Sequence, residues 1–272
     1  MHIEVLSSEG GRSSGYLLRH DGTTVLVDCG PGTAVAVARG GWLDQLDAVV
    51  ITHQHADHAA DLIGLAYARR FPDPMPEIPL LAPLSALDVL HRLDDLFAVP
   101  TLPQMASTIA ASFNPSPLSV DGTPVPIAGH LRLASYPAAH AVPSAALRFS
   151  TEQESVTFSS DTGTCAALIE AARLASLFLC EATYLDASPA ELQHHGHLTP
   201  QLAATTAADA GARRLVLTHL ARPADAPTAI AIAGQHFHTA PITVATPGTT
   251  ITMTPTGQCI THPLGRCSPD SP

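Results

Sequence analysis

The sequence contains no lysine; its thirteen basic residues are all arginines, against 24 acidic ones. The resulting formal charge of −11 disfavours a protein that grips nucleic acid through phosphate contacts, because such proteins usually present a basic face. Paired basic residues occur only at Arg69–Arg70 and Arg213–Arg214. A small anion can still bind an acidic chain where a metal ion supplies local positive charge.

Cysteine is also scarce, and no Cys-x-x-Cys pair occurs, which disfavours a thiolate zinc site. Buried or free thiols in a reducing cytosol are expected at Cys29, Cys165, Cys180, Cys259 and Cys267. No apolar run approaches about 18 residues, so no membrane span is predicted. The first residues, MHIEVLSSEG, show no basic-then-apolar leader. We therefore expect a cytoplasmic protein without a membrane partner.

The 272 residues are 46% hydrophobic with mixed charge, which indicates a globular chain. Apolar runs typical of strands cover residues 3–6, 15–18, 23–32, 46–52, 131–136, 145–150, 155–163, 175–184, 213–220 and 241–254. Helical patterns cover 33–39, 57–70, 84–97, 164–174 and 200–211. We predict one domain over 1–255, with a proline-rich surface lid or crossover at 71–127 and a loose tail from 256 to 272.

Four metal-binding side chains crowd into the stretch ITHQHADHAA, at His53, His55, Asp57 and His58. Alternate side chains of an extended backbone point to one side, so the first three can converge while His58 faces elsewhere. Imidazole and carboxylate groups suit zinc, and also iron or manganese. A lone histidine is more often an ordinary polar residue, but four ligands directly after an apolar strand predict a site divided between two metal ions.

The same pattern of a polar ligand at the end of an apolar strand recurs at His140, Asp161 and His219. Each residue alone has an ordinary explanation. Asp161 could belong to a turn or cap a helix, and His219 could face solvent. Their recurrence in this order favours further metal ligands.

These motifs, with LLRHDGTTVLVDCGPG near the start, resemble those of metallo-β-lactamase-fold hydrolases from about residue 3 to 220. The resemblance implies an α+β fold, a four-layer αββα sandwich with a dinuclear site at one edge. It implies two divalent ions, Zn²⁺ first, with Mn²⁺ or iron as alternatives. By position, one metal would take His53, His55 and His140, the other Asp57, His58 and His219, with Asp161 bridging them and Asp28 orienting the ligands from behind.

Three further stretches, FLCEATY, HHGHLTP and AGARRLVLTHL, resemble the phosphodiesterase branch of this superfamily, which includes ribonuclease Z and bacterial cyclic-nucleotide phosphodiesterases. This resemblance implies that the catalytic residues are His197, Glu181 and Asp57, with His197 donating a proton to the leaving oxygen. A carboxylate beside an imidazole favours its protonated form. The alternative is a polar loop, which suits His194 and His195 better, since neither is in the motif's register.

The expected function is hydrolysis of a cyclic nucleotide, such as cyclic AMP to 5′-AMP, or of a similar small phosphodiester. Ribonuclease Z carries a long tRNA-gripping arm between the positions of His140 and Asp161, which are only 21 apart here, so tRNA is disfavoured as a partner. The alternatives are a ribonuclease Z-like endonuclease, a lactonase, thioesterase or biosynthetic hydrolase, and a metal-free binding module. A homodimer is common among similar enzymes and is one expected assembly.

Overall fold

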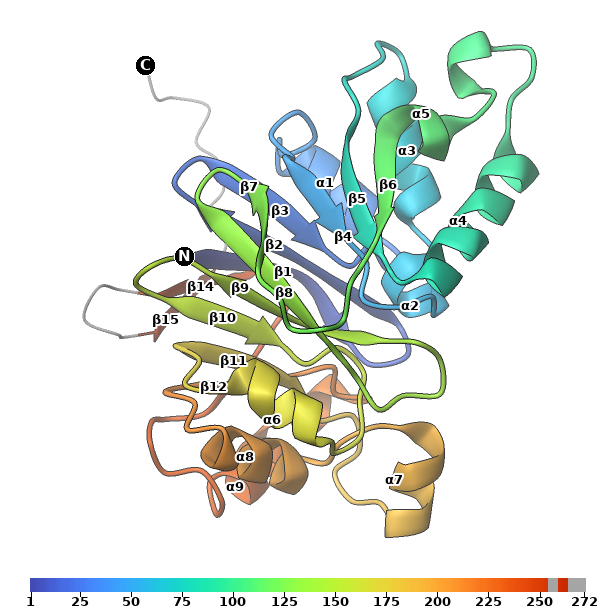
Figure 1. Cartoon of the computed structure of the whole chain (residues 1–272). Helices are drawn as coiled ribbons and strands as arrows, with labels where there is room; N and C mark the ends of the chain where they lie inside the picture. The colour runs from blue at the N-terminus through green and yellow to red at the C-terminus, as the bar shows by residue number, and fades with distance from the viewer. Residues whose placement is uncertain (254–258, 264–272) are drawn as a thin grey trace.

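The computed structural model describes residues 1–253 and 259–263, which form two facing β-sheets (Figure 1). The first sheet has the order β15-β14-β1-β2-β3-β4-β5-β6 and the second β13-β12-β11-β10-β9-β8-β7. The first contains β1 (His2–Glu9), β2 (Ser13–His20), β3 (Thr23–Val27), β4 (Ala48–Val50), β5 (Ile78–Ala82), β6 (Phe113–Pro117), β14 (Thr249–Met253) and β15 (Cys259–Pro263). The second contains β7 (Val125–Ala128), β8 (Leu131–Pro137), β9 (Ala145–Ser150), β10 (Ser155–Phe158), β11 (Leu177–Glu181), β12 (Leu215–Thr218) and β13 (Thr243–Val244).

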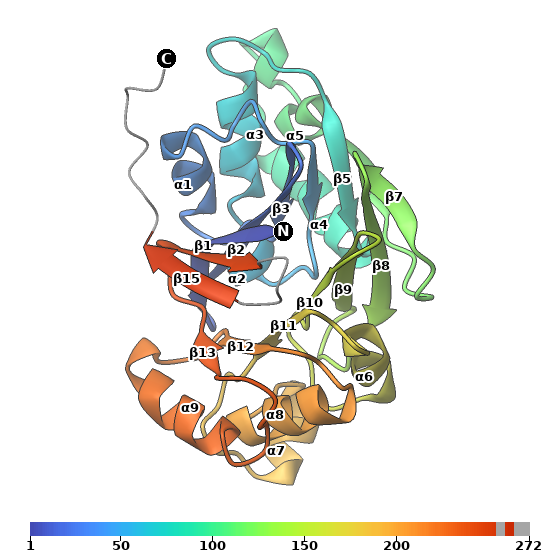
Figure 2. The same ribbon diagram turned by 90° about the vertical axis from the view of Figure 1, so that its left-hand side faces the viewer.

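Helices cover the outer face of each sheet, as Figure 2 shows. Those on the first sheet are α1 (Thr33–Arg39), α2 (Ala56–Ala59), α3 (Leu62–Arg70), α4 (Leu84–Phe97) and α5 (Thr108–Ser112). Those on the second are α6 (Ala166–Ala172), α8 (Pro200–Asp209) and α9 (Ala226–Ala233), while α7 (Pro189–His195) stands to one side. Short 3₁₀ turns occur at Pro103–Met105 and Pro223–Asp225.

The alternation of side chains along the strands divides the core into three layers. Leu18 and Val25 point between the two sheets, whereas Leu17 and Leu26 point toward the helices on the first sheet. Strand β3 is buried along its whole length because both faces of its sheet are covered. The predicted four-layer αββα sandwich is confirmed.

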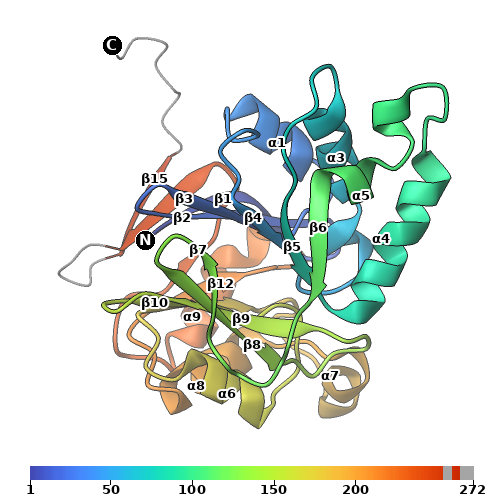
Figure 3. The ribbon, with the colours of Figure 1, turned by 45° about the horizontal axis from the view of Figure 1, so that its top comes forward.

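The segment 71–127, predicted as a surface lid or crossover, also contributes two strands to the first sheet. Strand β5 pairs in parallel with β4, and β6 pairs in parallel with β5, beside α4 and α5 (Figure 3). Phe113 is fully buried against that helical layer. The frequent prolines concealed this, since Pro115 and Pro117 lie in the edge strand β6, where a missing amide donor is tolerated.

Replacing Phe113 with alanine tests whether this segment belongs to the core. We expect Phe113→Ala to lower the free energy of unfolding by about 3–5 kcal/mol, because a buried ring is replaced by a cavity. Leu96→Ala, at a 72% exposed position of α4, should change it by less than about 0.5 kcal/mol. Urea unfolding followed by circular dichroism measures both, and equal midpoints would place 71–127 outside the core.

Two other regions differ from the sequence prediction. The helix predicted over 57–70 is broken at Ala60 and Asp61, where the Asp61 amide donates to the carbonyl of Cys29. The tail predicted as loose contains β15, which pairs antiparallel with β14; residues 264–272, including Cys267, lie outside the described residues. Within the described part of the chain, no helix is long and apolar enough to cross a membrane.

Candidate dinuclear metal centre

The predicted site residues gather at one edge of the sandwich, where loops leave the carboxyl ends of strands from both sheets. Asp28 follows β3, and His53 follows β4, its parallel neighbour. Asp161, Glu181 and His219 follow or end β10, β11 and β12, which are also mutually parallel. Because parallel strands end at the same edge of a sheet, residues far apart in sequence meet here.

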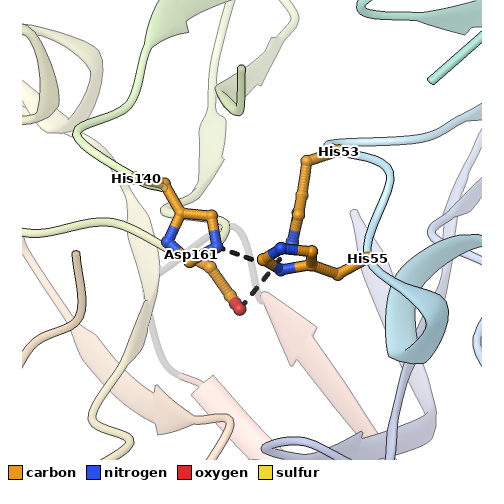
Figure 4. A group of neighbouring side chains, drawn as sticks. All are labelled: His53, His55, His140 and Asp161. Atoms are coloured by element: carbon orange, nitrogen blue, oxygen red, sulfur yellow. Dashed lines mark hydrogen bonds and ion pairs between the residues drawn. The ribbon is translucent and has the colours of Figure 1, made fainter. Parts of the chain in front are cut away.

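One group of ligand atoms comes from the loop after β4 and from two loops of the second sheet, as Figure 4 shows. It comprises His53, His55, His140 and Asp161, whose ligand atoms all lie within 4.8 Å of one another. Nε2 of His140 lies 3.2 Å from Nδ1 of His55, and Nε2 of His53 lies 3.8 Å from Oδ2 of Asp161. This is the set predicted for the first metal, together with the predicted bridging aspartate.

A second group comprises Asp57, His58, Asp161 and His219, also within 4.8 Å of one another. Oδ1 of Asp161 lies 3.3 Å from Nε2 of His58 and 3.4 Å from Nε2 of His219. Oδ2 of Asp57 lies 3.4 Å from the same nitrogen of His219 and accepts a hydrogen bond of 3.0 Å from the amide of Gly11. Asp161 therefore presents one oxygen to each group.

In three of the ligand histidines, a hydrogen bond to one ring nitrogen determines which nitrogen is free. Nδ1 of His58 donates to Oδ2 of Asp28 at 2.7 Å, and Nδ1 of His140 donates to the carbonyl of Gly196 at 2.9 Å. Nδ1 of His219 lies 3.1 Å from the hydroxyl of Thr183. In each ring the proton on Nδ1 leaves the lone pair of Nε2 directed into the cluster, as metal-binding histidines require.

Asp28, predicted to orient the ligands from behind, is held by several donors. Its Oδ1 accepts from the amide and the hydroxyl of Thr52, at 2.8 and 2.9 Å, and its Oδ2 accepts from the hydroxyl of Ser14 at 3.1 Å. The backbone of Asp28 has a positive φ of 60°, and Ser160 and His219 adopt similar values of 56° and 58°. Such conformations are costly for residues other than glycine, and they concentrate at functional sites.

The charges of the cluster favour a cation at its centre. Burial opposes ionisation of Asp161, but His219 and His58 outweigh it and hold the pKa of this carboxyl well below its usual value. Burial also opposes the charged form of His58, yet Asp161 and Asp28 raise its pKa well above the usual value. Burial and the neighbouring His58 lower the pKa of His53. Two buried carboxylates thus require positive charge beside them.

The residues fit a pair of divalent metal ions. Nε2 of His53 is fully buried and has no hydrogen-bond partner, although the ring is oriented toward Asp161. A buried polar atom without a partner is costly unless it is ligated. Imidazole nitrogens and carboxylate oxygens are suitable donors for zinc, iron or manganese.

The predicted catalytic pair lies directly beside the second group. Nδ1 of His197 lies 2.9 Å from Oε1 of Glu181, and the His197 ring stacks on the ring of His219 with centroids 6.1 Å apart. Burial opposes protonation of His197, but its hydrogen bond with Glu181 and the charge of that carboxylate raise its pKa. Glu181 is 1% exposed and accepts hydrogen bonds from five donors, which fix its position: Thr162, Thr183 through both amide and hydroxyl, His197 and Leu198.

The sequence HHGHLTP places His197 by ending one helix and starting another. Gly196 ends α7 in the left-handed conformation, with φ 66°, and a Cβ there would lie 2.6 Å from the carbonyl of Ala139. Thr199 caps α8 by accepting from the amide of Leu202, and Pro200 occupies the first turn. His197 therefore sits on a short, fixed linker. His194 and His195, set aside in the sequence, lie exposed on α7, outside both groups.

Thr183 is a functional candidate that the sequence did not reveal. Its hydroxyl donates to Oε2 of Glu181 at 2.6 Å and lies 3.1 Å from Nδ1 of His219, so it joins the catalytic pair to the second group. Threonines that follow a strand are common. Only the fold brings Thr183 between Glu181 and His219.

We expect Thr183→Val to weaken metal binding at the second group by about 10–100-fold, the usual cost of removing a partner behind a ligand. Thr183→Ser keeps the hydroxyl and should bind metal like the original protein. Competition with a chromogenic chelator measures the affinity of each ion. Equal affinities for the valine variant and the original protein would exclude this role.

Comparisons with known proteins identify the family and the fold of this chain. A β-lactamase superfamily domain matches residues 23–220. An uncharacterized protein of Mycobacterium leprae (strain TN) is 35% identical over 216 residues, covering 76% of this chain and 71% of that protein. Ribonuclease Z of Thermobifida fusca (strain YX) is 29% identical over 248 residues, covering 76% and 77%. The crystal structure of the metallo-β-lactamase fold protein YhfI from Bacillus subtilis superposes with a TM-score of 0.76 at 22% identity, covering 92% of this chain and 98% of that one, and so shares its fold.

Proposed function

This chain belongs to the β-lactamase superfamily, whose members with this fold are metal-dependent hydrolases. From that membership we propose that the chain is a dinuclear phosphodiesterase. Its substrate is a small phosphodiester, with 3′,5′-cyclic nucleotides such as cyclic AMP as the first candidates. The observation that carries the proposal is the pair of buried Glu181 and half-buried His197 beside the second group. A proton donor is needed where the leaving group is a poorly acidic alcohol, as in a sugar phosphodiester.

The metal ions, when bound, lower the pKa of water and neutralise the charge that develops on the phosphate oxygens. The two groups, with Asp161 between them, are the residues that hold them. We assign zinc to the site first, because three of the four residues in the first group and two of the four in the second are histidines.

The chain's own residues account for the two proton transfers. Water that attacks phosphorus forms a new P–O bond and loses a proton, which the carboxylate of Asp57 in the second group can accept. The bond to the leaving oxygen breaks as Nε2 of His197 donates a proton to that oxygen. Glu181 keeps the other nitrogen of His197 occupied and stabilises the imidazolium before transfer.

A ribonuclease Z-like RNA-processing activity is the second candidate, because a relative 29% identical over most of this chain bears that name. The net charge of −11 counts against it. Residues 140–161 are all described, and they form a loop followed by the short strands β9 and β10, without an arm.

A substrate panel distinguishes these functions. Cyclic AMP, a chromogenic diester, a precursor tRNA, a lactone and a thioester would be assayed side by side with protein of known metal content. We expect the highest kcat/KM on the small diesters. Activity on acyl substrates alone would contradict phosphodiester chemistry, and salt-sensitive cleavage of the precursor tRNA would favour the second candidate.

A further inference from the structure

A cavity of about 370 Å³ adjoins His197, lined by residues of α7 and α8 and of the loops at 139 and 163–164. Its other walls are Ala139, Gly163, Thr164, Leu192, Gly196 and Leu202. We propose that this cavity holds the organic group attached to the leaving oxygen, so that the substrate is a phosphodiester with a compact, uncharged leaving group of nucleoside size. This inference rests on the proposed function and narrows its substrate class.

The position of His197 links the cavity to the reaction. Nδ1 of His197 is occupied by Glu181, so Nε2 is the nitrogen that can reach a leaving oxygen. The edge of the ring faces His140, with centroids 5.0 Å apart, which places His197 between the first metal group and the cavity. An oxygen within hydrogen-bond distance of Nε2 has its carbon substituent a bond length away, in the space that this cavity provides.

The chemistry of the walls defines what the cavity accepts. Among the described residues that line it, none carries a carboxylate or a guanidinium, and His197 is the only titratable one. A second phosphate placed there would lose water without gaining a guanidinium partner, which is costly, whereas an uncharged sugar and base would not need one. The volume lies at the lower end of the ~300–1,000 Å³ of small-molecule pockets. A nucleoside fits these limits, and an RNA chain with a charge at every linkage does not.

Two positions allow the cavity to be narrowed without touching the metal ligands. A Cβ added at Gly163 would meet the carbonyl oxygen of Ala139 at 3.4 Å and Cα of Gly196 at 3.6 Å, which are ordinary contacts. Gly163→Ala therefore adds a methyl group without forcing the backbone to move. Leu192 lies in the half-exposed helix α7, where a larger side chain is tolerated. Leu192→Trp is the stronger obstruction, and Leu96→Trp, on the exposed face of α4, is its matched control.

The test compares two diesters on metal-loaded protein: a dinucleoside monophosphate, whose leaving group is a nucleoside, and methyl p-nitrophenyl phosphate, whose leaving group is small. We expect Gly163→Ala and Leu192→Trp to lower kcat/KM on the first by at least tenfold more than on the second. Metal content should be unchanged, and Leu96→Trp should match the original protein. Equal losses on both diesters would overturn the assignment of the cavity.

Equilibrium binding of adenosine provides a readout that does not depend on turnover. The metal-loaded original protein should bind adenosine at least tenfold more tightly than Leu192→Trp does, as measured by calorimetry. Equal binding by the two proteins, or none by either, would contradict a nucleoside subsite. If the original protein hydrolyses neither of these diesters nor cyclic AMP, the proposed function fails, whereas the adenosine measurement still decides on the cavity.

Discussion

Asp161→Ala is expected to lose metal and activity together. This residue presents one oxygen to each group, and both oxygens lie within 3.8 Å of ligand nitrogens. Removal of a residue behind a ligand costs about 10–100-fold in metal affinity or activity, so loss of a shared ligand should cost more than about 100-fold in kcat/KM. Elemental analysis after gel filtration should find fewer metal ions per chain in this variant than in the original protein.

The control for this variant is Asp95→Ala, which removes an exposed carboxylate from α4 in the outer helical layer. It should keep full metal content and full activity. Two ions per chain in a folded Asp161→Ala protein would contradict the shared role of this carboxylate.

Whereas Asp161→Ala should lose metal and activity together, His197→Ala is expected to lower turnover and leave the metal content unchanged. Loss of a general acid typically costs about 10²–10⁴-fold, and this range applies to a substrate whose leaving group is a sugar oxygen. A diester with a p-nitrophenol leaving group needs no proton from the enzyme, so its turnover should fall much less. The measurement is the kcat of His197→Ala on each of the two diesters, relative to the original protein, with the metal content determined on the same sample.

His195→Ala is the matched control, because His195 is exposed at the end of α7 and lies outside both metal groups. Glu181→Gln should reproduce the selective defect of His197→Ala more weakly, since the amide keeps the shape of Glu181 but removes the charge that raises the pKa of His197. Equal losses on both kinds of leaving group in His197→Ala would remove this histidine from proton transfer.

The metal groups could be predicted from the sequence because their physical basis is local. His53, Asp161 and His219 each follow an apolar strand, and strands buried on both faces are recognisable as runs such as LDAVVIT and RRLVLTHL. Parallel strands in one sheet then bring their carboxyl ends to one edge. The structure places His53, Asp161 and His219 together at that edge, as the pattern predicted.

Features that depend on contacts between distant parts of the fold could not be predicted from strand patterns in the sequence. Thr183 matters only because β11 and β12 place it between His219 and Glu181. Ser14 supports Asp28 from a strand with no chemical motif of its own. The prolines in β5 and β6 hid these strands from prediction. Proline lacks an amide donor and is tolerated in edge strands as well as in loops, so the sequence pattern alone does not distinguish the two.

Metal titration of the metal-free protein, with cyclic AMP hydrolysis followed at each addition, tests the central claim most directly. The two groups that share Asp161 predict that activity develops with the binding of two ions per chain and is abolished by a chelator. The product should be 5′-AMP, because protonation of the 3′ oxygen makes it the leaving group. Hydrolysis that is independent of added metal, or a metal-loaded protein that cleaves acyl substrates and no phosphodiester, would contradict the account.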